Sequence, residues 1–249
     1  MDNGTSLLEV FLYALLTAVA TGLGALPFLF LKKLSKVWMA RANALAAGLM
    51  LCASFSLVQE GIAHDGAALR TILGLILGLV FIIAAEKVVH RMGHISIAEL
   101  NGADANRALL IFGVMTLHSA AEGIGIGVSF GGGEVLGVYI SLALALHNVP
   151  EGLAISLAMV PQGASVKKAA GYSILSSLPQ PLLAIPAFLF VGVFAPFLPV
   201  GLGFAAGAMV WMCFAEILPD AFKNDKPTNI GITITLAIAA MTLFQAWVH

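Results

Sequence analysis

The stretch that decides the fold is residues 134–160, which read EVLGVYISLALALHNVPEGLAISLAMV. An apolar helix of about 20 residues crosses the hydrocarbon core of a bilayer, so this run is long enough to span a membrane. Its centre nevertheless holds an imidazole and a carboxylate, His147 and Glu151, followed by Gly152. Side chains four residues apart share one face of a helix. The run therefore predicts a membrane helix with polar chemistry at its middle.

The same pattern occurs one apolar run earlier, in residues 107–130, as His118-Ser-Ala-Ala-Glu122-Gly123. A charged side chain at the bilayer centre costs about 2.5–3.5 kcal/mol on insertion scales, so two glutamates cost about 5–7 kcal/mol. Packing alone gives no reason to bear that cost. We therefore expect a function that needs these two imidazoles and two carboxylates together.

The composition indicates a membrane protein along the whole chain. Of the 249 residues, 60% are hydrophobic and only 10% are charged, whereas soluble domains are about 25% charged. This leaves no room for a soluble domain, so we expect residues 1–249 to form a single polytopic domain. The net charge of −1 gives no indication of a nucleic-acid partner, and we expect none. Cys52 and Cys213 both fall inside apolar runs, which argues against a disulfide framework.

Apolar runs of membrane-spanning length recur along the sequence. We expect eight transmembrane helices, at residues 6–31, 37–60, 67–90, 107–130, 134–160, 169–194, 197–219 and 228–248. The connections between them are short, and the longest polar stretch is 91–106. The predicted fold class is therefore an all-α integral membrane protein.

Basic residues give these helices a direction, because loops rich in Lys and Arg stay in the cytoplasm. Eleven of the 12 basic residues flank the first, third, fifth and seventh loops, namely Lys32, Lys33, Lys36, Arg41, Lys87, Arg91, Arg107, Lys167, Lys168, Lys223 and Lys226. Only Arg70 falls on the other side. We expect the basic face to be cytoplasmic and both termini to lie outside, towards the exterior or an organelle lumen.

Two stretches of sequence resemble each other, which indicates either an internal repeat or only the small-residue composition that membrane helices share. Residues 47–55 read AGLMLCASF and residues 206–214 read AGAMVWMCF, in the second and seventh spans, which cross in opposite directions. The two histidine units lie in the fourth and fifth spans, which are also antiparallel. These matches fit an arrangement of three helices, a central pair and three more helices, in which the two halves are related by inversion. Inverted repeats are typical of transporters, which bind their substrate near the bilayer midplane.

The two histidine units together have the composition of a metal site. Each histidine lies about a dozen residues into its helix, near the midplane. Imidazole and carboxylate donors suit zinc, iron, manganese and related divalent cations, and two carboxylates would neutralise the cation's charge. Pro150 cannot donate to the carbonyl of Leu146, so that oxygen and the amide oxygen of Asn148 are further candidate ligands. Gln180 adds a neutral amide at membrane depth, for which a functional and a structural role remain open.

The string His147-Asn-Val-Pro-Glu-Gly-Leu-Ala, with His118-x-x-x-Glu122-Gly123 one span earlier, resembles the ZIP (zinc/iron-regulated transporter-like) family. The likeness is strongest to its bacterial and plant-type members with a short loop between spans three and four. It implies eight helices, outward termini, a homodimer and movement of a divalent metal towards the cytoplasm. It also implies an elevator-like shift of spans one, four, five and six against the other four.

The resemblance carries site residues over by position. It implies a primary metal site made of His118, Glu122, His147 and Glu151. It implies a second site, which shares the two glutamates, at Ser119, Asn148 and Gln180. The family usually has Asn and Pro in span four, where this chain has Ser119 and Ala121, and Glu in span six, where it has Gln180. We therefore predict one strong metal position, with a second weak or absent.

Three functions are compatible with such a site. The leading hypothesis is a divalent metal transporter, not an enzyme, in a plasma, inner or organelle membrane, for zinc first and for iron, manganese or cadmium next. The alternatives are an intramembrane zinc-dependent hydrolase and a metal-sensing membrane protein. The hydrolase lacks support because the chain has no His-Glu-x-x-His motif on one helix.

Overall fold

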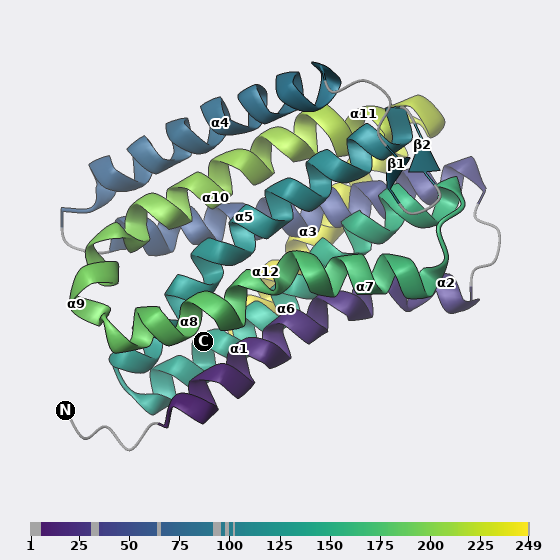
Figure 1. Ribbon diagram of the computed structural model, residues 1–249. Coiled ribbons are helices and arrows are strands. Elements are labelled where there is room, and N and C mark those ends of the chain that lie inside the picture. The colour runs from purple at the N-terminus through teal and green to yellow at the C-terminus, as the bar shows by residue number, and fades with distance from the viewer. Residues whose placement is uncertain are drawn as a thin grey trace.

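A computed structural model describes residues 6–30, 35–63, 66–91, 96–97, 100–101 and 103–248, although the side chains of 89–90, 96–97, 100–101, 103–107, 143, 147 and 247–248 lie outside the description. The chain forms a bundle of long, roughly parallel and antiparallel helices (Figure 1). Its elements are α1 (Leu7–Gly22), η1 (Leu23–Ala25), α2 (Pro27–Phe30), α3 (Lys36–Ala63), α4 (Ala68–Arg91), β1 (Ser96–Ile97), β2 (Leu100–Asn101), α5 (Ala103–Gly131), α6 (Glu134–Met159), η2 (Val160–Gln162), α7 (Val166–Ser177), α8 (Pro179–Leu189), α9 (Val191–Phe194), η3 (Ala195–Phe197), α10 (Leu198–Met212), η4 (Cys213–Ile217), α11 (Leu218–Asn224) and α12 (Pro227–Val248).

The described residues contain eight stretches long and apolar enough to cross a membrane. They are Leu7–Phe30, Lys36–Ala63, Ala68–Val88, Ala108–Gly131, Glu134–Gln162, Val166–Leu189, Val191–Asn224 and Pro227–Ala246. The prediction of an eight-helix, all-α membrane protein is thereby confirmed. The described strands are β1 and β2, an antiparallel pair of two residues each between α4 and α5.

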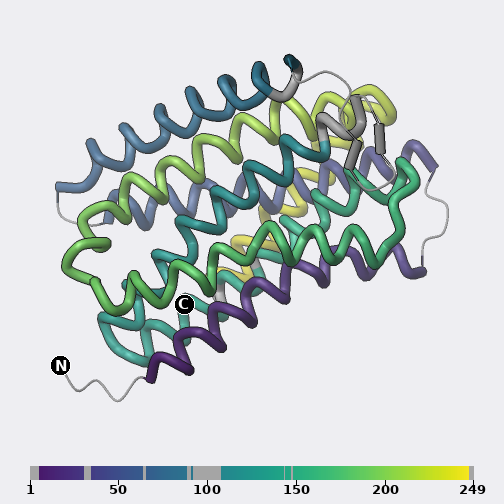
Figure 2. The backbone as a smooth tube through the Cα atoms, viewed as in Figure 1, coloured from purple at the N-terminus to yellow at the C-terminus, as the bar shows by residue number. Residues whose placement is uncertain are grey.

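The sixth and seventh spans differ from their predicted limits. The sequence predicted helices at 169–194 and 197–219, but the chain leaves the helical conformation at Phe190, whose φ and ψ are −119° and 43°. The short α9 and η3 then lead into α10, as the green segment of the tube shows (Figure 2). The predicted boundary between the sixth and seventh helices was therefore too late in the chain, because the Pro-containing sequence after Phe190 continues in short helical turns.

Glycines bring α4 and α10 together at backbone distance. Gly74 and Gly78 of α4 lie against the backbone of α10, and Gly203 and Gly207 of α10 lie against the backbone of α4. A Cβ at any of these four positions would overlap the facing helix. The two helices run side by side along the upper edge of the bundle in Figure 1. Helix α3 packs against both α10 and α12. We call the four helices α3, α4, α10 and α12 the outer group.

A second set of close contacts joins α1, α5, α6, α7 and α8, which we call the site group. Gly123 and Gly127 of α5 lie against the backbone of α8. Gly152 of α6 lies against the Thr21 carbonyl of α1, and Gly24 of η1 lies against the backbone of α6. Because glycine has no Cβ, these backbones can approach so closely. The helices that carry the two histidine units are therefore packed tightly against their neighbours in the site group.

Basic residues gather at one end of the bundle. Arg91 ends α4, Lys167 and Lys168 lie in the first turn of α7, and Lys223 lies near the end of α11. Arg70, near the start of α4, lies at the opposite end and donates to the Pro196 carbonyl. This distribution matches the asymmetry that the sequence predicted for the loops.

Candidate metal centre

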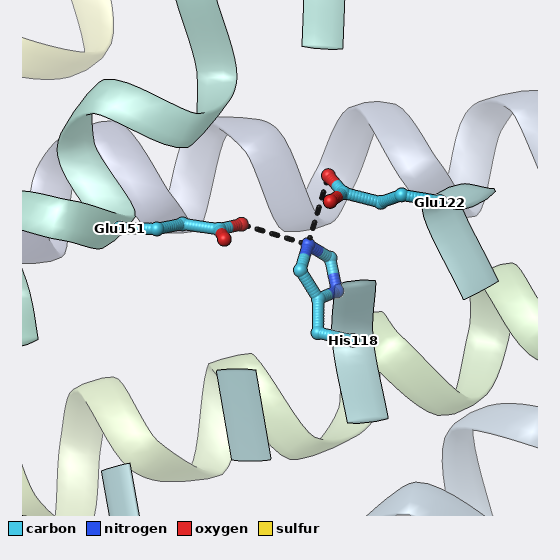
Figure 3. A group of neighbouring side chains, drawn as sticks. All are labelled: His118, Glu122 and Glu151. Carbon is cyan, nitrogen blue, oxygen red and sulfur yellow. Dashed lines mark ion pairs between the residues drawn. The ribbon is translucent and has the colours of Figure 1, made fainter. Parts of the chain in front are cut away.

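Three side chains of the two histidine units converge inside the site group. His118 Nε2 lies 3.2 Å from Glu122 Oε1 on its own helix, α5, and 2.8 Å from Glu151 Oε1 on α6. Figure 3 shows the imidazole nitrogen aimed at both carboxylates. All three side chains are buried, and one ligand atom from each lies within 4.8 Å of the others. These distances would allow a single small cation to contact all three.

The helices position these groups through their regular spacing. His118 and Glu122 share a face of α5 because they are four residues apart. Glu151 follows Pro150, which lies inside α6 without ending the helix. The backbone of His147 belongs to α6, but its side chain lies outside the described residues. The predicted fourth donor therefore remains a prediction.

Carboxylates outnumber imidazoles among the described side chains of the centre. Of the side chains that the structure describes, the carboxylates of Glu122 and Glu151 and the imidazole of His118 meet here. Within the described part of the chain, neither carboxylate oxygen of Glu151 accepts a hydrogen bond apart from the ion-pair contact of Oε1 with His118. Buried charges in proteins are paired or coordinate metals. The donor set and its charge therefore fit a divalent cation.

Asn148 and Gln180 form a polar network directly beside this centre. Asn148 Nδ2 donates to the Thr17 carbonyl of α1 at 2.8 Å and to Gln180 Oε1 at 3.1 Å. Gln180 Nε2 in turn donates to Glu122 Oε2. Asn148, Gln180 and Thr17 are completely buried, and Asn148 Oδ1 has no hydrogen-bond partner among the described residues.

Ser119 belongs to a neighbouring group of hydroxyls. Its Oγ donates to Ser177 Oγ of α7 at 3.5 Å, and Ser177 Oγ lies 2.7 Å from Thr21 Oγ1 of α1. All three side chains are buried. The structure thus brings together His118, Glu122 and Glu151. Gln180 is hydrogen-bonded to Glu122, Asn148 is linked to the centre through Gln180, and Ser119 bonds to Ser177 of α7.

Sequence reasoning missed the role of Thr17. A single threonine in an apolar span is commonplace, since its hydroxyl can bond to the backbone of its own helix. Thr17 does this with the Ala14 carbonyl at 2.7 Å, yet its hydroxyl also lies 2.6 Å from Gln180 Oε1. Nothing in the sequence around it pairs span one with span six, so only the packing of α1 on α8 reveals the contact.

Comparison with known proteins agrees with this architecture. Residues 95–244 match the family described as "ZIP Zinc transporter". Zinc transporter GufA of Myxococcus xanthus is 35% identical over 240 residues, which are 90% of this chain and 94% of GufA. The chain belongs to the ZIP family. The family that the two histidine units predicted is thereby confirmed.

Two other relatives extend the comparison. Zinc transporter ZIPB of Bordetella bronchiseptica is 33% identical over 242 residues, which are 89% of this chain and 75% of ZIPB. An Arabidopsis thaliana protein named as a candidate zinc transporter is 45% identical over 253 residues, which are 99% of this chain and 40% of the plant protein. The chain therefore spans less than half the length of the plant relative, while it covers nearly all of the bacterial GufA.

Proposed function

We propose that this ZIP family protein moves a divalent cation, with zinc as the first candidate, across its membrane through the centre between α5 and α6. The observation that carries the proposal is the buried convergence of His118, Glu122 and Glu151 in a bundle of eight membrane-spanning helices. The relatives named as zinc transporters support the choice of zinc.

The cation would be held by nitrogen and oxygen donors from both histidine units. His118, Glu122 and Glu151 supply three donors, and we propose His147 as a fourth. The buried, unpartnered Oδ1 of Asn148 is a candidate neutral ligand. Two carboxylates would cancel the double charge of the ion, which lowers the cost of holding it in a medium of low dielectric. Iron, manganese and cadmium remain further candidates because they accept the same donors.

The packing supports an elevator-like mechanism in which the site group slides along the outer group. The glycines at the close helix contacts inside each group, such as Gly123 and Gly203, leave no room for a Cβ, whereas Gly125 and Gly201 at the boundary between α5 and α10 do. A Cβ on Gly125 would lie 3.8 Å from Leu198, and one on Gly201 would lie 3.6 Å from Ala121, both ordinary van der Waals distances. Small residues at these two boundary positions reduce the steric cost of relative motion there.

The basic end of the bundle supports a direction. Loops rich in Lys and Arg remain in the cytoplasm, so we propose that α7 begins and α4 ends at the cytoplasmic side. Both termini would then lie outside, and transport would proceed towards the basic end. We further propose that residues 1–249 act as one transporter domain and that two copies associate in the bilayer.

The two alternative functions have less support. An intramembrane hydrolase would need a metal-bound water as its nucleophile, and members of the ZIP family are transporters rather than enzymes. A sensor would bind the metal without releasing it on the far side. Flux across a sealed membrane separates these functions, because only a transporter changes the metal content of the vesicle interior.

The decisive experiment is zinc uptake into proteoliposomes that hold a zinc-sensitive dye. The Glu151→Gln variant should lose uptake, because it removes a carboxylate that contacts His118. Glu134→Gln is the matched control, since Glu134 is an exposed glutamate on the same helix and should transport like the unaltered protein. Undiminished uptake by Glu151→Gln, or no uptake by the unaltered protein, would contradict the proposal.

A further inference from the structure

The amide of Gln180 is the feature that decides how many cations the centre can hold. Gln180 follows the Pro179 that begins α8, and its side chain is completely buried. A Cβ on Gly123 would overlap the backbone of Gln180, so α5 and α8 touch at this level. That close approach brings the amide into contact with Glu122, the residue next to Gly123.

The orientation of the amide follows from a main-chain carbonyl. The Thr17 carbonyl can only accept, so the group of Asn148 that faces it at 2.8 Å must be its NH₂. The same NH₂ lies 3.1 Å from one end of the Gln180 amide, which must therefore be the oxygen. The other end, the NH₂, then faces Glu122. Turning the amide round would set donor against donor at Asn148 and acceptor against acceptor at Glu122.

The Thr17 hydroxyl is consistent with this orientation. It lies 2.6 Å from Gln180 Oε1 and 2.7 Å from the Ala14 carbonyl, so its single proton is shared between two acceptors. The Gln180 oxygen thus accepts from Asn148 and from Thr17, on the side facing α1 and α6. It is turned away from Glu122 and cannot serve as a ligand beside that carboxylate.

The two oxygens of Glu122 are consequently divided between two partners. Oε1 faces His118 at 3.2 Å, and Oε2 accepts from Gln180. A hydrogen bond to one oxygen fixes the plane of the carboxylate and directs the other towards the metal centre, as groups behind a metal ligand commonly do. The N–H also carries partial positive charge at the place where a second cation would have to bind Oε2.

We propose that Gln180 is a positioning residue that aims Glu122 at the metal centre and limits the centre to one divalent cation per chain. This inference rests on the proposed function, because it assumes that the centre binds a metal. It assigns the amide a role opposite to that of a ligand: its donor end takes the position that a second cation would use. Asn148 and Thr17 hold the amide in that orientation.

The test is the number of zinc ions bound per purified chain in lipid nanodiscs, measured by elemental analysis and by titration calorimetry. The unaltered protein should bind one zinc. Gln180→Glu replaces the donor with oxygens and should bind two, a gain that misfolding cannot produce. Two zinc ions on the unaltered protein, or one on Gln180→Glu, would overturn the inference. Failure of the unaltered protein to bind any zinc would instead contradict the proposed function.

A second variant separates positioning from stoichiometry. Gln180→Leu removes the donor but adds no ligand, so it should still bind one zinc, with an affinity lower by about 10–100-fold, the usual effect of losing a group behind a metal ligand. Gln245→Leu is the control, because Gln245 is a glutamine that bonds to Ser56 between α3 and α12, in the outer group. Unchanged zinc affinity in Gln180→Leu would show that the amide does not position Glu122.

Discussion

His118 Nε2 and Glu151 Oε1 lie 2.8 Å apart and join the two histidine units across the boundary between α5 and α6. Both atoms are potential metal ligands, and together with one oxygen of Glu122 they lie close enough to hold a single cation between the two helices.

We expect zinc binding to weaken as the pH falls. Nitrogen and carboxylate ligands bind metal only when deprotonated, so protons compete with zinc for the same atoms. Displacement of one proton predicts a loss of about tenfold in affinity per pH unit below neutrality. Titration calorimetry between pH 7.5 and 5.5, in buffers of different ionisation enthalpy, measures both the affinity and the protons released. An affinity that stays flat over this interval would contradict the assignment of these ligands.

The ion pair between Arg41 and Asp225 predicts a different dependence on pH, at the basic end of the bundle. Arg41 Nε donates to Asp225 Oδ2 at 2.8 Å, and Asn229 Nδ2 donates to Oδ1, also at 2.8 Å. The Arg41 and Asn229 hydrogen bonds, in that order, lower the pKa of the Asp225 carboxyl to about 2. Because the pKa is lower in the folded state, the stabilisation is present above pH 4 and is lost as the pH falls towards 2.

Asp225→Asn should therefore unfold at a lower temperature than the unaltered protein at pH 7, and the difference should shrink between pH 4 and pH 2. Thermal unfolding followed by circular dichroism in detergent checks this expectation. Glu134→Gln, at an exposed site, should show no such convergence. A gap that is the same at every pH would mean that the Asp225 charge does not contribute.

Gly152 and Gly113 should respond oppositely to the same substitution. A Cβ on Gly152 would overlap the Thr21 carbonyl, whereas nothing lies within 4 Å of a Cβ on Gly113. Gly152→Ala must push α1 away from α6, and overpacking of this kind costs about 1–3 kcal/mol. Gly113→Ala should be neutral or slightly stabilising, because alanine favours a helix over glycine. The unfolding temperatures of the two variants measure the contrast, and equal values would contradict it.

Gly201 tests whether the boundary between the two groups has to slide. A Cβ at Gly201 would lie 3.6 Å from Ala121, so Gly201→Ala fits as the protein stands. Gly201→Leu fills the boundary and should block relative motion without touching the metal ligands. We expect Gly201→Leu to bind zinc normally but to lose most of its uptake in proteoliposomes, while Gly201→Ala retains both. Normal uptake by Gly201→Leu would argue against sliding at this boundary.

The sequence by itself determined the class of the protein. Eight apolar runs require eight helices, because a backbone in hydrocarbon must satisfy its own hydrogen bonds. The four-residue spacing of His118 and Glu122 placed both on one face of α5, and the two histidine units identified the ZIP family. These conclusions follow from local rules of helix geometry and solvation, so they needed no knowledge of which helices touch.

Only the tertiary structure decided how the polar groups are shared. The partners of Gln180 come from α1, α5 and α6, up to 163 residues away in the chain, and no periodicity within one helix encodes such contacts. An amide can present either its oxygen or its NH₂, and the sequence could not choose between them. The choice is made by the Thr17 carbonyl, which accepts but cannot donate, once glycine contacts have brought the helices together.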